Sequence, residues 1–152
     1  MSSKFKRKGK AKFLMIDGWI VRTPAYRAMT PNDRSAYLEL KWRYDGLNNG
    51  RIGLSIRDLA AALGIGKNAA SISLLRLQEL GFVAIAKKGA FSVKHRVASE
   101  WLLTEYKCDV TGELARKDFS RWHSLEKNTV PFEGHSVPSQ GHQAMFREAK
   151  VA

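Results

Sequence analysis

The sequence has a single cysteine, few acidic residues and no long apolar run. One thiol, Cys108, cannot form an internal disulfide bond, which excludes a small secreted domain held together by disulfides. No stretch approaches the roughly 20 apolar residues of a membrane-spanning helix, so we expect no membrane partner. Only 14 Asp and Glu stand against 26 Lys and Arg, and the formal net charge is +12 at pH 7. An excess of this kind favours polyanionic partners.

Two segments contain nearly all of the positive charge. Residues 1–12 carry six Lys or Arg and no acid, and residues 65–97 carry six against one, so +6 and +5 account for +11 of the +12. We predict that residues 1–12 form a flexible basic arm. The apolar residues that follow are interrupted by Asp17 and Gly18 and lead to no cleavage pattern, which is not typical of a signal peptide. The total length fits one domain with tails.

Two Thr-Pro pairs mark the first half of the domain. Thr23 and Thr30 can accept N-cap hydrogen bonds, and the proline after each takes the first helical position, where its missing N–H costs nothing. These pairs predict helices over residues 24–29 and 31–45, after an extended segment or strand at 13–16. The longer helix would turn one apolar face to the core, with Tyr37, Leu40 and Tyr44.

Short strands, helices and glycine turns follow. Residues 51–54 predict a strand, and Ser55 with Asp58 forms a capping-box pattern that opens a helix ending at Leu63. A tight turn at 64–66 leads to a third helix, 67–80. Its expected core positions are Ala70, Leu74, Leu77 and Leu80. Ile72 and Leu75 fall on its outer side, where they would pack under the N-terminal segment or form a dimer contact.

After Gly81 the pattern predicts a hairpin. Its strands would be residues 82–86 and 90–93, around a turn at Lys87-Lys88-Gly89. A further short strand is predicted at 101–104.

The C-terminal part has weaker patterns. We expect residues 106–126 to form an extension, with a helix over 114–122 anchored by Phe119 and Trp122. Residues 127–152 repeat a Val-Pro pattern and are predicted to be disordered or loosely packed. Two copies of such a repeat cannot form a solenoid.

The order helix, strand, helix, glycine turn, helix and basic hairpin resembles a winged helix-turn-helix domain. The residues that carry the resemblance are Ser55-Ile56-Arg57-Asp58-Leu59-Ala60-Ala61-Ala62-Leu63-Gly64-Ile65-Gly66-Lys67-Asn68-Ala69-Ala70-Ser71, then Leu74, Leu77 and Leu80-Gly81-Phe82-Val83. Similar domains occur in bacterial transcription regulators and in the replication initiators and replisome organisers of plasmids and phages. The resemblance implies an α+β, mainly helical fold for residues 13–105. It also implies double-stranded DNA as partner and a cytoplasmic, nucleoid-associated protein.

A recognition helix enters the major groove with small, polar or basic residues, and those near its N-terminus reach base edges. Asn68 can pair with adenine, Lys67 with guanine or phosphate, and Ala69 can touch a thymine methyl. The expected DNA contacts of this helix are Lys67, Asn68, Ala69, Ser71 and Arg76. Lys87 and Lys88 of the hairpin would lie along the DNA backbone or in the minor groove. The arm residues Lys4, Lys6, Arg7, Lys8 and Lys10 would contact phosphates or enter the minor groove, with phosphate contact favoured. A solubilising tail is the alternative for the arm.

Other functions find less support in the sequence. The run at 64–68 lacks the first glycine and the hydroxyl residue of a nucleotide-binding loop. The histidines and Cys108 lack zinc-site spacing, and no catalytic set stands in a recognisable context. We therefore expect no enzyme, cofactor or metal. A replication initiator and a protein-interaction adaptor remain alternatives to a transcription regulator. A homodimer and a protein partner for the tail remain open.

Overall fold

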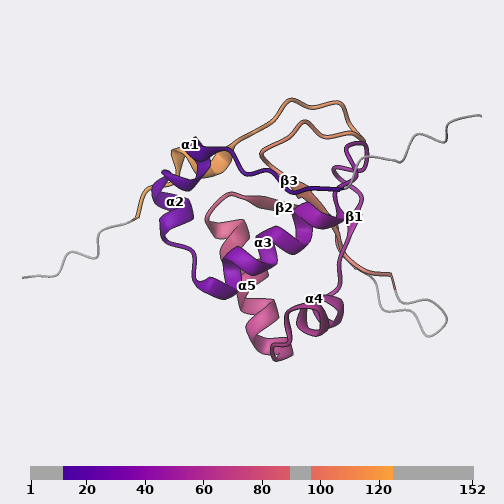
Figure 1. The fold of residues 1–152 in the computed structure, drawn as a ribbon. Helices are drawn as coiled ribbons and strands as arrows, with labels where there is room; N and C mark the ends of the chain where they lie inside the picture. Colours follow the sequence, from indigo (N-terminus) through magenta and orange to yellow (C-terminus); the bar gives the residue numbers. More distant parts are fainter. Residues whose placement is uncertain (1–11, 90–96, 125–152) are drawn as a thin grey trace, which may run out of the picture.

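The computed structural model describes residues 12–89 and 97–124. The predicted arm residues Lys4, Lys6, Arg7, Lys8 and Lys10, the strand at 90–93 and the tail at 127–152 lie outside these residues. The described part is an α+β structure with five α-helices and a three-stranded antiparallel sheet (Figure 1). The elements are α1 (Gly18–Val21), α2 (Pro24–Arg27), α3 (Pro31–Arg43), β1 (Ile52–Gly53), α4 (Ile56–Leu63), α5 (Lys67–Glu79), β2 (Val83–Lys87), β3 (Glu100–Leu103) and the 3₁₀ helix η1 (Asp118–Arg121).

The helix starts follow the predicted chemistry. The Thr23 hydroxyl accepts a hydrogen bond from the Tyr26 N–H at 3.2 Å, with proline at the first helical position. Thr30 caps α3 in the same way, and Asp33 completes a capping box that the sequence reading did not anticipate. The extended segment expected at residues 13–16 has no strand partner, and α1 directly after it was not predicted.

The sheet has the strand order β1-β3-β2, so β3 is central. Val83 pairs with Leu103, and Ile85 pairs with Trp101. Among the described residues, β2 therefore pairs with β3. The sequence predicted residues 90–93 as the partner in a hairpin and 101–104 as a separate strand. Lys87 was expected in a turn, but it lies within β2 opposite Glu100.

The core lies between the helices and the sheet. The four predicted core positions of α5, Ala70, Leu74, Leu77 and Leu80, are all buried, as are Tyr37 and Leu40 of α3. Tyr44 is only half-buried and ends α3 as its C-cap. The ring of Tyr37 meets that of Phe82 edge-on, with centroids 5.1 Å apart. These contacts fix α5 against α3 and against the start of the sheet.

The segment after β3 packs on the same core. Where we expected a helix over 114–122, only η1 is helical, and Leu114 is 86% exposed. Phe119 is fully buried and stacks on Phe82 with a centroid distance of 4.5 Å. Gly81 has φ +80°, and a Cβ there would lie 2.7 Å from the Phe119 nitrogen, so only glycine fits. In Figure 1, η1 lies beside α1, far from α4.

Candidate functional site

The start of α5 differs from the other long helix starts of the domain. Its N-cap is Gly66, which offers no side-chain hydrogen bond, and its first turn contains no acid. Lys67 and Asn68 are exposed there, and Ser71 is half-buried one turn later. The first backbone N–H groups of a helix have no partner inside the helix. At α5 they are left without a side-chain cap, beside a lysine.

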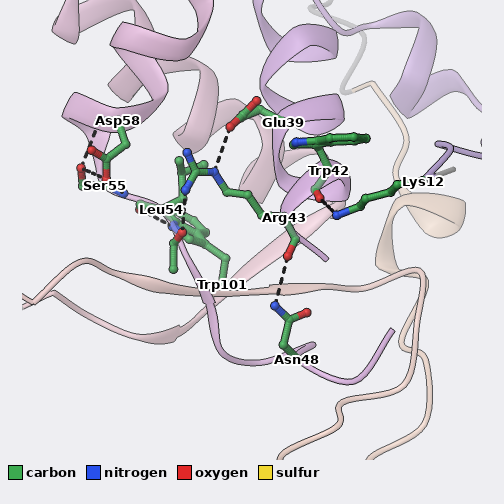
Figure 2. Close-up of polar contacts among 10 residues, drawn as sticks. Lys12, Glu39, Trp42, Arg43, Asn48, Leu54, Ser55, Asp58 and Trp101 are labelled. Atoms are coloured by element: carbon green, nitrogen blue, oxygen red, sulfur yellow. Dashed lines mark hydrogen bonds and ion pairs between the residues drawn. The ribbon is translucent and has the colours of Figure 1, made fainter. Parts of the chain in front are cut away.

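The helices α3 and α4 satisfy their own first turns. In α4 the Ser55 hydroxyl accepts from the Asp58 N–H at 3.1 Å, and the Asp58 carboxylate accepts from the Ser55 N–H at 3.4 Å (Figure 2). The hydrogen bond from the Ser55 hydroxyl, 2.7 Å long, lowers the pKa of the Asp58 carboxyl. A negative charge thus already occupies the positive end of each of these two helix dipoles. Of the three longest described helices, only α5 leaves its start open to an external anion.

The outer face of α5 continues from this start. Lys67, Asn68 and Ser71 lie on it, and Ala69 at its edge is half-buried. Ile72 and Leu75 follow, 57% and 56% exposed. Their outward position agrees with the sequence pattern. Their exposure shows that residues 12–16 do not cover them, and residues 1–11 of the N-terminal segment lie outside the described residues.

Arg76, which the sequence predicts as a DNA contact, makes two hydrogen bonds within the fold. Its Nε donates to Asp33 Oδ2 at 3.1 Å, and its Nη2 donates to the Ala28 carbonyl at 3.1 Å. Asp33 is 1% exposed, and its other oxygen, Oδ1, has no hydrogen-bond partner. A buried carboxylate needs a counter-charge. Arg76 therefore ties α5 to α2 and α3, while its side chain remains 42% exposed.

The two hairpin lysines lie apart from the start of α5. Lys87 is in β2, opposite Glu100. Lys88 lines a hollow of about 550 Å³ together with Gln78 and Glu79, which are at the C-terminal end of α5. The structure therefore brings Lys67, Asn68 and Ser71 together and leaves Lys87 and Lys88 as a separate group.

Further cations are paired within the fold. Lys41 is buried and donates to both oxygens of Glu105, at 2.8 and 3.0 Å. The Tyr37 hydroxyl donates to the same carboxylate. Burial, and then the Glu105 charge, raise the pKa of Tyr37. Arg43 pairs with Glu39 at 2.9 Å, as Figure 2 shows. The Lys41–Glu105 pair thus joins α3 to the segment after β3, whereas the Arg43–Glu39 pair lies within α3.

One exposed cation was not singled out from the sequence. Arg57 lies exposed in the first turn of α4, the helix that precedes α5. The first helix of a helix-turn-helix crosses the DNA backbone. The signal that could have found Arg57 is its place at the second position of that helix.

Comparison with protein-family models, with curated proteins and with solved structures found no match to this chain. Within residues 12–89 and 97–124 no group of three or more His, Cys, Asp or Glu could hold a metal ion. In the same residues, no helix is long and apolar enough to cross a membrane. The start and outer face of α5 are therefore the strongest candidate for a functional site among the described residues.

Proposed function

We propose that this protein binds double-stranded DNA in a sequence-specific manner, through a winged helix-turn-helix domain whose recognition helix is α5. The observation that carries the proposal is the start of α5. It lacks a side-chain cap and an acid and carries Lys67 and Asn68 exposed, while α3 and α4 are each closed by a capping box. An anion is the natural ligand of such a helix start, and DNA is the anion that uses a whole helix face.

The order of elements supports the proposal. A helix, α3, precedes the short strand β1, then α4, a glycine turn and α5, and then β2 and β3, which close the sheet on β1. Gly64 in the turn has φ +65°, the left-handed conformation that favours glycine at a helix end. The same order carried the sequence resemblance, and α4 and α5 contact each other and α3.

In this proposal each residue has a distinct role. Asn68 reads a base edge, Lys67 contacts a base or a phosphate, and Arg57 contacts a phosphate. Lys87 and Lys88 contribute phosphate contacts beside the sheet. We propose a transcription regulator of a bacterial or mobile element. A replication initiator would use the same interface, and repeated copies of the bound site at an origin would favour it.

The decisive experiment is selection of bound fragments from a random pool of duplex DNA by the full chain. We expect one enriched motif, bound far more tightly than unrelated DNA. Lys67→Ala should weaken binding, and Lys107→Ala, an exposed lysine outside the interface, should leave it unchanged. If no motif is enriched, the protein does not bind DNA in a sequence-specific manner. An absence of salt-sensitive DNA binding would favour a protein-interaction adaptor.

The basic arm has its own test. Deleting residues 2–11 removes five cations and retains Lys12, which lies over the Trp42 ring at 4.6 Å. If the arm contacts phosphates, the slope of log affinity against log salt should flatten by about 0.9 for each phosphate lost. The ranking of DNA sequences should not change, because phosphate contacts carry no sequence information. An unchanged slope would mean that the arm does not touch DNA.

A further inference from the structure

The exposed face of α5 contains both polar and apolar side chains. Lys67, Asn68, Ser71, Ile72 and Leu75 follow the spacing that places residues on one side of a helix. From Lys67 to Leu75 the helix rises about 12 Å at 1.5 Å per residue. That length matches about three to four base steps of 3.4 Å. The whole face can therefore lie against one short stretch of a groove.

The two apolar side chains are not needed by the fold. Ala70, Leu74 and Leu77 of the same helix fill the core, whereas Ile72 and Leu75 are more than half exposed. Single exposed apolar residues are common and need no explanation. These two are neighbours on the surface, and they continue the line that begins with Lys67 and Asn68. Their position therefore indicates that the molecule bound to this face has an apolar group.

The charge of the same face restricts the occupant. The first twelve residues of α5 contain no acid, and Glu79 is the first to follow Lys67. The helix start attracts an anion, so the occupant combines negative charge with an apolar group at the depth of Ile72 and Leu75. A major groove that exposes thymine has this combination, because only thymine shows a methyl group there.

We infer that α5 recognises thymine methyl groups through Ile72 and Leu75, next to an adenine read by Asn68, so that the bound site is rich in A·T pairs. This inference rests on the proposed function and names its preferred substrate. Lys67 and the start of α5 bind the DNA backbone. Asn68 makes two hydrogen bonds to adenine, one as acceptor and one as donor. The side chains of Ile72 and Leu75 shield the thymine methyl groups from water.

The test removes methyl groups without changing base pairing. In a duplex that carries the selected site, each thymine is replaced in turn by deoxyuridine, which lacks only the C5 methyl. We expect one or two positions at which the affinity of the full chain falls about fourfold, the loss that corresponds to one methyl group returned to water. The Ile72→Ala, Leu75→Ala double variant should bind the thymine and deoxyuridine duplexes equally.

Controls separate this inference from its alternatives. Leu38→Ala changes an apolar residue of α3 that is 38% exposed, and it should retain full sensitivity to deoxyuridine. Sedimentation of wild type and of the double variant measures oligomeric state. If Ile72 and Leu75 instead hold a second copy, the variant will dissociate a dimer without losing methyl sensitivity, which overturns the inference. Sequence-specific binding that is indifferent to every deoxyuridine overturns it too and leaves the proposed function standing. An absence of DNA binding overturns both.

Discussion

The two faces of α5 contain the same kinds of residue, but in opposite surroundings. On the packed side Arg76 is held by buried Asp33, and Leu77 is fully buried. On the open side Lys67 has no ion pair among the described residues, and Leu75 is more than half exposed. The function of a charged or aliphatic side chain therefore cannot be inferred until the residues around it are known. Under the proposed function, the net charge of +12 favours a polyanionic partner, and described cations without an ion pair, such as Lys67, suggest where it would bind.

The strongest contrast is expected between Leu77 and Leu75. Leu77→Ala should lower the free energy of unfolding by about 2–5 kcal/mol, since it leaves a cavity in the core. Leu75→Ala should change the same quantity by less than about 0.5 kcal/mol, as surface substitutions usually do. Urea denaturation of the two variants measures both. Equal losses would mean that α5 is rotated about its axis from the orientation described.

The two cations of α5 should separate stability from binding. Arg76→Ala removes a hydrogen-bonded partner of the Asp33 carboxylate, of which Oδ1 already has none, and should cost about 1–3 kcal/mol of stability. Arg76→Lys should recover part of this, because it keeps the charge but loses the two-armed donor geometry. Arg27→Ala, on exposed Arg27 of α2, is the control. A change of DNA sequence preference without loss of stability would return Arg76 to the DNA interface.

Asn68 provides the sharpest test of base reading. If its amide makes two hydrogen bonds to one adenine, Asn68→Ala should cost about 1–3 kcal/mol of binding at that base pair. Affinity for unrelated DNA should barely change. Competition between the selected site and its single-base variants measures this. A uniform loss over all sequences would make Asn68 a backbone contact.

The smallest effect on stability concerns Gly66. Its backbone suits any residue, with φ −68°, and a Cβ there would meet nothing within 4 Å. Gly66→Asp should give α5 the kind of cap that α4 has and raise stability by a few tenths of a kcal/mol. It should also weaken DNA binding about fivefold, through repulsion of a phosphate. Gly66→Asn adds the cap without the charge and should cost less affinity. Tighter binding by Gly66→Asp would contradict an anion at this helix start.

Local patterns predicted much of this fold. The Thr-Pro starts, the Ser55–Asp58 capping box and the glycine turn before α5 act within a few residues, and the structure contains each of them. The predicted face of α5 was right for its leucines because helical spacing determines it. The ion pair of Arg76 could not be predicted, because its partner Asp33 is 43 residues away in the sequence. No periodicity shows that a carboxylate will be buried beside it.

The strand partners and η1 were missed for the same reason. The pairing of β2 with β3 depends on contacts across a long connection, and the alternation of residues within each strand does not identify its partner. Phe119 was expected to anchor a helix but instead fills a place between Phe82 and Trp19. Within the candidate site, the sequence identified Lys67, Asn68 and Ser71. It could not show that, of the three longest described helices, α5 alone lacks a side-chain cap.

The close approach of Phe119 to Gly81 bears on how the chain folds as it is synthesised. The Gly81 carbonyl accepts hydrogen bonds from the Phe119 N–H at 3.2 Å and from the Thr104 hydroxyl at 2.6 Å. Phe119 also stacks on Trp19, one hundred positions earlier in the chain, with centroids 5.4 Å apart. A nascent chain that ends at β2 therefore contains every helix of the proposed DNA-binding unit, but the ring of Phe82 then lacks the stacked ring of Phe119. Contacts so distant in sequence form slowly, and the uncovered surface invites association until they form. The residues translated last among those described thus complete the core around the first ones.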